Sequence, residues 1–220
     1  MDARASREIA QLRPHLRTAL VADALDAIGR RSQCLGPGIV PLQSNVAIVG
    51  RAFTVTAIPA DRPAHPPYVG LLKALDEIGT EEVFIYPTSR SDRAAVWGEL
   101  ISAACVARGV VGVVTDGLVR DAMRIRQLDF PVFCRGHLPY DVNGRLEVVD
   151  HGQIVEIDGV RIAPGDLVIA DDDGVVIVPA DVEEEVIERS LGKDALEKQF
   201  RDAVEHGDTA QRAFERFDVL

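Results

Sequence analysis

The stretch WGELISAACVARGVVGVVTDGLVRDAMRIRQLDFPVFC, residues 97–134, decides the fold class. Residues 97–108 predict a helix, and residues 110–115 form a continuous apolar run that is typical of a strand covered on both faces. Residues 120–128 then predict a short helix, and residues 131–134 predict another strand. This alternation of helix and strand predicts a mixed α/β domain.

The sequence before this stretch predicts the same class of structure. Residues 9–28 carry apolar side chains at helical spacing, with Thr18 as a candidate helix cap. Residues 46–58 alternate and are rich in Val, Ile and Thr, so they predict a strand or a strand pair. Residues 68–78 predict a helix, and residues 83–86 a short buried strand.

The C-terminal part has a different pattern, with short strands punctuated by Asp-Gly and Pro-Gly turns. The expected strands cover residues 146–149, 154–157, 160–162, 167–170 and 175–178. Asp181 and Glu184 resemble a capping box that opens a final helix, and a second helix is expected from Asp194 to about His206, before a polar tail that frays. We therefore expect one domain over residues 1–220, with an all-β layer over the α/β part.

Composition excludes several function classes. The chain has 220 residues, of which 47% are hydrophobic and only 5% aromatic, so its core must be mostly aliphatic. The 35 acidic residues outnumber the 24 Lys and Arg residues, which gives a formal net charge of −11. Nucleic acids and anionic membranes both attract clustered cations, so neither is expected as a partner.

Cysteine usage and the N-terminus point to a cytoplasmic protein. Cys34, Cys105 and Cys134 are odd in number and lack CxxC spacing, which favours small buried side chains over disulfides or a zinc site. Residues 1–12 carry charges throughout and lack the apolar segment that a signal peptide needs, so a signal peptide is not expected. Apolar runs in the sequence stay shorter than the ~18 residues of a membrane helix.

Glu99, Arg120 and Asp121 are the candidate chemical residues. Glu99 opens a predicted helix, and Arg120 and Asp121 follow the next predicted strand, so all three can meet at one sheet edge, where ligand sites gather. Two carboxylates there could hold Mg²⁺ or Mn²⁺, and Arg120 could stabilise an enolate oxygen. The alternative is that Glu99 is a favourable first-turn charge, while Arg120 and Asp121 are surface residues that cap the following helix.

These residues belong to a larger pattern that resembles the RraA-like family. The family's signature has an acidic residue, then twenty residues, then Arg-Asp, and residues 100–119 separate Glu99 from Arg120 here. Other similar pieces follow in the same order along the chain. They are residues 18–26 (TALVADALD), 50–55 (GRAFTV), 130–133 (FPVF), 164–166 (PGD) and 170–176 (ADDDGVV).

The resemblance implies a fold and an activity. The fold would be the three-layer swivelling β/β/α arrangement, similar to phosphohistidine domains, assembled as a homotrimer or homohexamer. The family includes metal-dependent 4-hydroxy-4-methyl-2-oxoglutarate/4-carboxy-4-hydroxy-2-oxoadipate aldolases, which also decarboxylate oxaloacetate. The implied function is thus a divalent-metal-dependent lyase that cleaves a C–C bond of a pyruvyl-containing 2-oxo acid through a metal-stabilised pyruvate enolate.

The resemblance also implies residue roles. Asp121 would ligate Mg²⁺ or Mn²⁺ directly, Glu99 would hold metal-bound water, and Arg120 would contact the pyruvyl oxygens. The substrate carboxylate would be bound around Gly98 by the first N–H groups of the helix, which are those of Leu100, Ile101 and Ser102.

The sequence also departs from the family's pattern. A frequent family glycine is Ala95 here, and residues 86–93 (YPTSRSDR) replace a glycine-rich segment, which leaves the substrate open. Arg90 and Arg93 either bind a second substrate carboxylate or are solvated loop charges. Glu197 is a candidate acid that a neighbouring subunit's C-terminal helix would add to the site.

Two other function classes stay open. The chain could be a non-catalytic regulator that binds a ribonuclease or helicase, a role known in the family, or a small-anion binding protein without turnover. An intact set of Glu99, Arg120 and Asp121 favours the enzyme, because an interaction protein does not need it. Lysines do not follow a buried strand, which disfavours a Schiff-base aldolase, and glycine-rich nucleotide motifs are absent from the sequence.

Overall fold

An eight-stranded mixed sheet forms the centre of the computed structural model, which describes residue 9 and residues 11–220. Its strand order is β1-β7-β5-β3-β2-β11-β12, and β8 pairs with the far half of β2. The strands are β1 (Val40–Pro41), β2 (Ile48–Pro59), β3 (Glu82–Tyr86), β5 (Gly112–Thr115), β7 (Val132–Cys134), β8 (Leu146–His151), β11 (Leu167–Asp171) and β12 (Gly174–Val178). The pairs β2–β3, β3–β5 and β5–β7 are parallel, which confirms the predicted α/β alternation.

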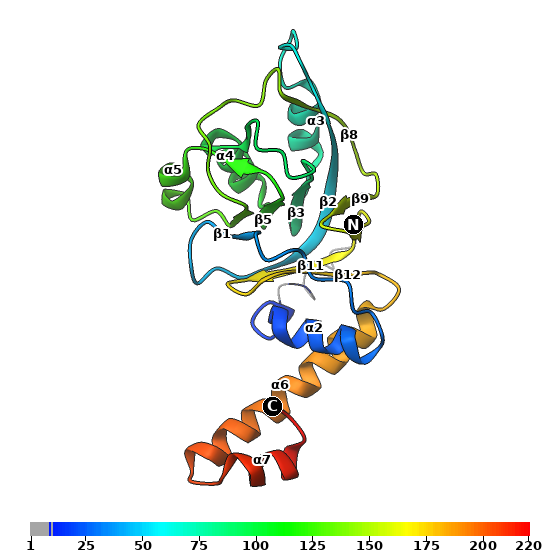
Figure 1. Cartoon of the computed structure of the whole chain (residues 1–220), viewed down its shortest axis with the longest axis vertical. Helices are drawn as coiled ribbons and strands as arrows, with labels where there is room; N and C mark the ends of the chain where they lie inside the picture. Colours follow the sequence, from blue (N-terminus) through cyan, green and yellow to red (C-terminus); the bar gives the residue numbers. More distant parts are fainter. Residues whose placement is uncertain (1–8, 10) are drawn as a thin grey trace.

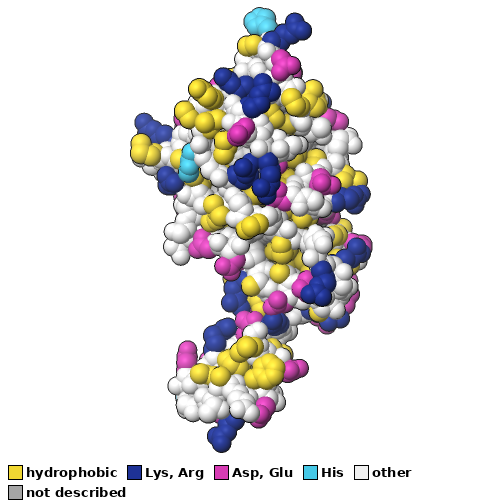
Figure 2. Space-filling view, in the orientation of Figure 1, with side chains coloured by type: hydrophobic (Ala, Val, Ile, Leu, Met, Phe, Trp, Pro, Cys, Tyr) yellow, Lys and Arg dark blue, Asp and Glu magenta, His cyan; other side chains and the backbone are white. Residues whose placement is uncertain are grey.

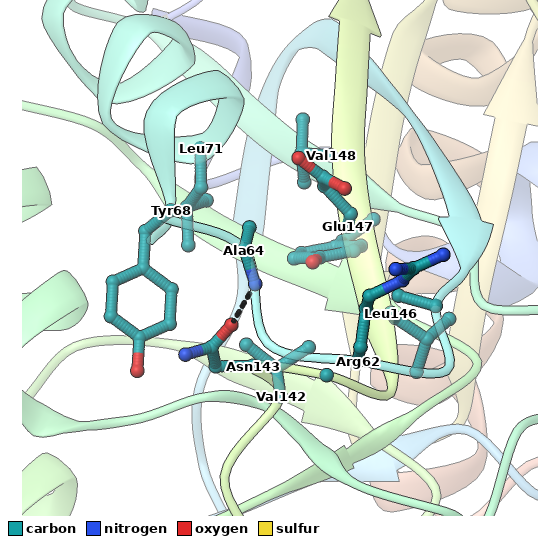
Figure 3. Close-up of a pocket in the computed structure, with 12 residues that line it drawn as sticks. Arg62, Ala64, Tyr68, Leu71, Val142, Asn143, Leu146, Glu147 and Val148 are labelled. Carbon is teal, nitrogen blue, oxygen red and sulfur yellow. Dashed lines mark hydrogen bonds between the residues drawn. The ribbon is translucent and has the colours of Figure 1, made fainter. Parts of the chain in front are cut away.

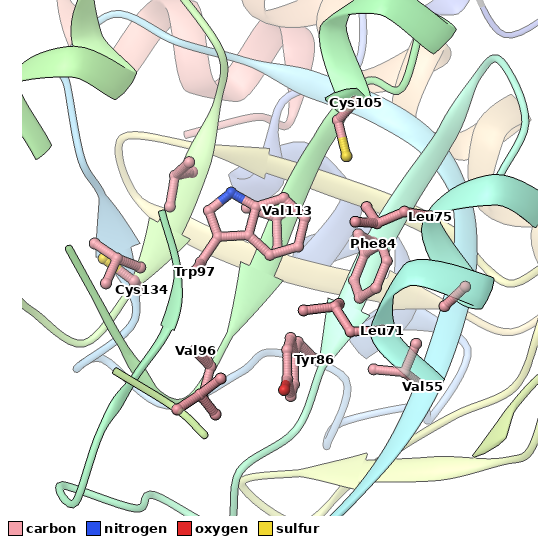
Figure 4. Packing of buried hydrophobic residues seen from close by; sticks show 14 of the residues in the cluster. Val55, Leu71, Leu75, Phe84, Tyr86, Val96, Trp97, Cys105, Val113 and Cys134 are labelled. Atoms are coloured by element: carbon pink, nitrogen blue, oxygen red, sulfur yellow. The ribbon is translucent and has the colours of Figure 1, made fainter. Parts of the chain in front are cut away.

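Three helices cover one face of the parallel strands: α3 (Val69–Glu77), α4 (Glu99–Arg108) and α5 (Ala122–Gln127) (Figure 1). The core under them centres on Phe84 and Trp97, whose rings meet edge to face at 5.0 Å between centroids (Figure 4). Trp97 also stacks on Phe130 at 6.3 Å. The large aromatic side chains thus sit where α4 crosses the sheet, next to the residues that begin α4.

The opposite face of the sheet packs on a small antiparallel sheet of β9 (Val155–Ile157) and β10 (Val160–Ile162). Alternate residues of the same strands serve the two faces, so Val83 and Ile85 point to this second core while Phe84 points to the first. The result is three layers, with helices on one side of the main sheet and a β layer on the other, as the sequence predicts.

A third core joins the edge strands β11 and β12 to α2 (Thr18–Ala27) and to the start of α6 (Glu183–Glu205). Beyond this contact, α6 extends away from the body, and α7 (Ala210–Phe217) folds back against it (Figure 1). The expected break at Asp194 is wrong, because α6 is one helix of 23 residues. The tail expected to fray instead forms α7, with Thr209 as its cap: the Thr209 hydroxyl accepts the N–H of Arg212 at 3.2 Å.

Two helix starts also differ from prediction. Trp97 ends the short strand β4 (Ala95–Trp97), which pairs in parallel with β6 (Leu118–Val119), so helix α4 begins only at Glu99. Thr18 does not cap α2, because its N–H and its hydroxyl both bind the Asp171 carboxylate, at 2.9 and 2.5 Å.

Two predictions fall partly outside the described residues. The expected helix over residues 9–28 includes residue 10, and the signal-peptide prediction concerns residues 1–12. Over the described part of the chain, no helix is long and apolar enough to cross a membrane.

Candidate active site

The β4–β6 pair brings the two halves of the predicted site together. Because these strands are parallel, Trp97 and Val119 end side by side, and Gly98 and Arg120 follow at the same edge. The Arg120 N–H donates to the Trp97 carbonyl oxygen at 2.9 Å, which extends the pairing by one bond. Residues about twenty positions apart in the sequence thus become neighbours at the start of α4 and α5.

Gly98 permits a very close approach between these two segments. A Cβ atom at this position would lie 2.9 Å from Asp121 Oδ2 and 3.4 Å from Arg120 Cγ. The Asp121 carboxylate occupies that space and accepts the Glu99 N–H at 3.4 Å. Asp121 itself has a left-handed backbone conformation with φ of 59°, which turns the chain from β6 into α5. Gly98 is therefore needed for space and not for unusual backbone angles.

Arg120 is held by an acidic residue that the sequence analysis missed. The Arg120 Nη2 atom lies 3.0 Å from Asp141 Oδ1, and its Nε atom lies 3.9 Å from Asp121 Oδ2. Asp141 Oδ2 also accepts the Tyr68 hydroxyl at 2.6 Å and the Asn143 N–H at 3.1 Å. The guanidinium group is thus oriented from a loop that precedes β8 and from the start of α3.

This network fixes the charges of its members. Burial alone would raise the pKa of Asp141, but the hydrogen bonds from Tyr68 and Asn143 and the charge of Arg120 outweigh it, so the pKa lies below its ordinary value. The hydrogen bond to Asp141, with burial, raises the pKa of Tyr68. At neutral pH the site therefore holds an ionised Asp141 and a neutral Tyr68 phenol.

The first turn of α4 supplies fewer free N–H groups than predicted. The Ser102 N–H donates to the Gly98 carbonyl oxygen at 3.1 Å, so it is used within the helix. The buried Ser102 hydroxyl accepts the Trp97 indole N–H at 2.9 Å and donates to the same carbonyl at 3.1 Å. Ser102 thus fixes Trp97 and Gly98 in place, and a substrate role for it is not supported. The N–H groups of Leu100 and Ile101 have no acceptor among the described residues, as is usual for a first turn.

A cavity of about 350 Å³ opens beside these groups. Its lining combines the charged side chains of Arg120, Asp121 and Asp141 with a mostly apolar wall. The remaining lining residues come from α3 and the residue before it, from β4 and the residue after it, from the start of α4 and from the residue after Asp141; they are Tyr68, Leu71, Leu72, Leu75, Ala95, Val96, Trp97, Gly98, Leu100, Ile101 and Val142. Figure 2 shows basic, acidic and hydrophobic side chains side by side over the face that carries α4 and α5.

Tyr68 separates this cavity from a much smaller one. The second cavity holds about 20 Å³ and lies between Tyr68, Arg62 and the Asn143–Val148 segment (Figure 3). The Ala64 N–H donates to the Asn143 side-chain oxygen at 3.1 Å beside it. This space suits about one water molecule, so the larger cavity is the candidate for a substrate.

Other predicted site residues lie elsewhere. Arg90 Nε binds Asp158 Oδ1 at 2.5 Å, and Arg93 lies 3.8 Å from Asp61; neither arginine lines the cavity. The Glu197 carboxylate on α6 binds Arg17 of the same chain at 3.0 Å. Glu99 opens α4 but is not among the lining residues, and the described part of the chain holds no group of three or more His, Cys, Asp or Glu side chains placed to bind a metal.

Comparison with known protein families identifies the family to which the chain belongs. The family model described as "RraA-like: Aldolase/RraA" matches residues 18–177. The chain belongs to the RraA-like family. The match covers the main sheet and the candidate site and stops before α6.

Three proteins similar to this RraA-like chain show which members of the family it resembles. Protein DlpA of Legionella pneumophila is 29% identical over 200 residues, and the chain spans 32% of its length. A Halalkalibacterium halodurans protein named "Putative 4-hydroxy-4-methyl-2-oxoglutarate aldolase" is 30% identical over 197 residues, which cover 90% of this chain and 89% of that protein.

The third relative is a solved structure and confirms the predicted swivelling fold. RraAS2 of Streptomyces coelicolor, described as an unusual member of the RNase ES inhibitor RraA protein family, superimposes with a TM-score of 0.81 at 27% identity. The superposition covers 91% of this chain and 98% of that one.

Proposed function

We propose that this protein is a lyase that cleaves a C–C bond of a pyruvyl-containing 2-oxo acid, by retro-aldol cleavage or by decarboxylation. The observation that carries the proposal is the meeting of Arg120 and Asp121 with the first turn of α4 at one wall of a substrate-sized cavity. A curated relative with 30% identity, covering most of both chains, carries an aldolase name, which supports the same class of reaction.

The protein groups serve the reaction in distinct ways. The free N–H groups of Leu100 and Ile101 would bind the substrate carboxylate at the positive end of the α4 dipole. Arg120, oriented by Asp141, places positive charge where the 2-oxo oxygen becomes an enolate oxygen. Both retro-aldol cleavage and decarboxylation of an oxaloacetate-like acid produce that same enolate, so one site suits both.

We also propose that a divalent cation, Mg²⁺ or Mn²⁺, binds at Asp121 with support from Glu99. The donor chemistry fits, because Mg²⁺ takes oxygen ligands, uses one or two carboxylates and keeps several waters, so a third protein carboxylate is not required. The Asp121 side chain is 47% exposed and can accept such an ion. When bound, the cation would act as a Lewis acid on the 2-oxo group.

The test is pyruvate formation by the purified full chain. Oxaloacetate and 4-hydroxy-4-methyl-2-oxoglutarate are supplied with Mg²⁺ or with EDTA, and the rate without protein is subtracted. We expect EDTA to abolish turnover and added Mg²⁺ to restore it. Arg120→Lys should lower kcat/KM by about a hundredfold or more, as for loss of one oxyanion donor, whereas Arg124→Lys on the same segment should not.

Asp121→Asn tests the cation site, with the exposed Asp76→Asn as its control. Calorimetric titration with Mn²⁺ provides a second measurement that does not need turnover. Loss of Mn²⁺ binding in Asp121→Asn alone supports the assignment, whereas full cation-dependent turnover by this variant refutes it. EDTA-insensitive activity would refute the metal dependence while leaving the lyase in place.

A regulator acting by protein–protein binding is the second candidate, because the Streptomyces relative is described as a member of an RNase ES inhibitor family. Absence of pyruvate from every 2-oxo acid, together with inhibition of a ribonuclease by the same preparation, would favour it. The acidic chain is not proposed to bind nucleic acid itself.

We further propose that the chain forms a homotrimer or homohexamer. Large apolar side chains on α4 and α5 that do not line the cavity remain exposed in the single chain, with Met123 at 76% and Val106 at 47%. Burial of such side chains between subunits would be favourable. Light scattering after size-exclusion chromatography gives the mass directly, and a monomer at micromolar concentration would refute the proposal.

A further inference from the structure

The cavity is lined very unevenly. Its charged groups gather around Arg120, whose guanidinium lies 3.0 Å from Asp141 Oδ1 and 3.9 Å from Asp121 Oδ2. The wall formed by α3 presents Leu71, Leu72 and Leu75 instead. A ligand held at the charged end therefore has to place the rest of its body against leucine side chains.

The cavity has few positive groups. Arg120 is the one cationic side chain among the described residues that line it, and its guanidinium already binds Asp141 at 3.0 Å. Two carboxylates line the same space. A substrate with a second carboxylate, directed along α3, would bury that charge against apolar side chains without a partner, which is strongly unfavourable.

The two arginines that sequence analysis offered for a second carboxylate are engaged elsewhere. Arg90 is bound to Asp158 in the turn between β9 and β10, and its backbone N–H donates to the buried Asp116 at 2.7 Å. Arg93 lies beside Asp61. The loop over residues 86–93 is thus held by Asp116 and Asp158 and adds no cation to the cavity.

From this lining, and resting on the proposed lyase function, we propose that the preferred substrate is a 2-oxo acid with a single carboxylate and an apolar substituent. The reactive form is a 4-hydroxy-2-oxo acid whose C4 carries an alkyl or aryl group. The C3–C4 bond breaks, and its electron pair stays on C3 as the enolate of pyruvate. The 4-hydroxyl loses its proton as C4 becomes the carbonyl carbon of an apolar aldehyde. C3 then takes up a proton, so no oxidant or reductant is consumed.

The expected preference can be measured as a series. Each methylene that moves from water onto the leucine wall should raise kcat/KM about fourfold, the factor that corresponds to ~0.8 kcal/mol per buried methylene. Pyruvate release from 4-hydroxy-2-oxopentanoate, 4-hydroxy-2-oxohexanoate and 4-hydroxy-2-oxoheptanoate should therefore rise in that order. The dicarboxylate 4-hydroxy-2-oxoglutarate should fall at least about tenfold below the longest of these.

A matched pair of variants places the preference on this wall. Leu72 and Val69 are both on α3 and are equally exposed, at 54%, but only Leu72 lines the cavity. Leu72→Arg adds a cation to the wall and should shift the ratio of dicarboxylate to alkyl substrate by at least about tenfold toward the dicarboxylate. Val69→Arg should leave the ratio unchanged.

Binding of unreactive 2-oxo acids separates this inference from the proposed function. In calorimetry with Mg²⁺ present, 2-oxohexanoate should bind more tightly than 2-oxoglutarate, whether or not the protein turns over. If none of the substrates yields pyruvate, the lyase function fails, and the binding order alone decides the ligand class. A wild-type preference for dicarboxylates in either assay, or equal effects of Leu72→Arg and Val69→Arg, overturns the inference.

Discussion

Replacing Gly98 with alanine is expected to damage turnover while leaving the fold intact. The added Cβ would lie 2.9 Å from Asp121 Oδ2, a spacing that real Cβ atoms essentially never show, and 3.4 Å from Arg120 Cγ. Gly98 has φ of −156° and ψ of −177°, an extended backbone that alanine adopts readily. The collision therefore falls on the two side chains proposed to act, and the backbone can stay where it is.

The magnitude follows from how far these groups must move. The Asp121 carboxylate has to retreat by a few tenths of an ångström or more, and the Glu99 N–H that it accepts at 3.4 Å is then lost. Misplacement of a catalytic group by about 1 Å costs about a hundredfold in rate, so we expect kcat/KM to fall about tenfold to a hundredfold. Reduced freedom of the unfolded chain contributes about 0.4–1 kcal/mol of stability, which offsets much of the steric cost.

The assay pairs pyruvate formation with urea unfolding. Gly38→Ala is the matched control, because a Cβ at Gly38 meets nothing within 4 Å. It should keep its rate, and both variants should unfold within about 1 kcal/mol of the parent. A Gly98→Ala protein that turns over within twofold of the parent would refute the argument that this close approach positions the reacting groups. A large loss of stability would show instead that the collision reaches the backbone.

Three further predictions follow from the same geometry. The pKa of Asp141 is lower in the folded chain than in the unfolded one, so its stabilising contribution is complete above its unfolded pKa and is lost as the pH falls through its folded pKa. Tyr68→Phe, which removes a hydrogen bond to this carboxylate, should weaken that acid dependence in urea unfolding measured from pH 7 to pH 3 and cost about 1 kcal/mol at pH 7; an unchanged profile would contradict the network. Burial raises the pKa of Cys105 to about 12, so a thiol reagent at pH 8 should label the exposed Cys34 first and reach Cys105 only on unfolding, as mass spectrometry of labelled peptides can check. Trp97→Ala should cost about 3–5 kcal/mol in unfolding free energy, because the ring is 1% exposed and packs on two aromatic side chains; a loss under 1 kcal/mol would contradict the described core.

The parts of the site that could be predicted from sequence are those that depend only on residues close to one another along the chain. Glu99 is expected at the start of a helix, and Arg120 and Asp121 after an apolar strand, all at one sheet edge. The structure brings them together there, although the short strands β4 and β6 that they follow are not predicted. The apolar run that became β5 is buried on both faces, so its strand character is independent of distant contacts. Both signals are local, and both survive in the folded structure.

The parts that sequence could not provide depend on long-range contacts. Asp141 reaches Arg120 from a loop, and Tyr68 reaches Asp141 across 73 positions, with no spacing that marks either residue. The pairing of Arg90 with Asp158 also spans 68 positions, so the choice between a substrate contact and a solvated charge was not decidable locally. Helix α6 passes the expected break at Asp194, where the carboxylate binds Arg17 at 2.9 Å instead of starting a new helix.

Because Asp141 lines the cavity beside Arg120, its negative charge must be included in the net charge of the cavity. The three ionised lining groups, one arginine and two carboxylates, give a formal charge of 1 − 2 = −1. A cavity of that charge repels the carboxylate of a 2-oxo acid, and the two free N–H groups of the α4 start supply only a partial positive charge. A bound divalent cation would change the sum to −1 + 2 = +1, which attracts the same anion. The binding of an unreactive 2-oxo acid should therefore require Mg²⁺ in the parent chain. It should become less dependent on Mg²⁺ in Asp141→Asn, where one negative charge is gone. Tight binding to the cation-free parent chain would mean that Arg120 alone is sufficient to hold the substrate.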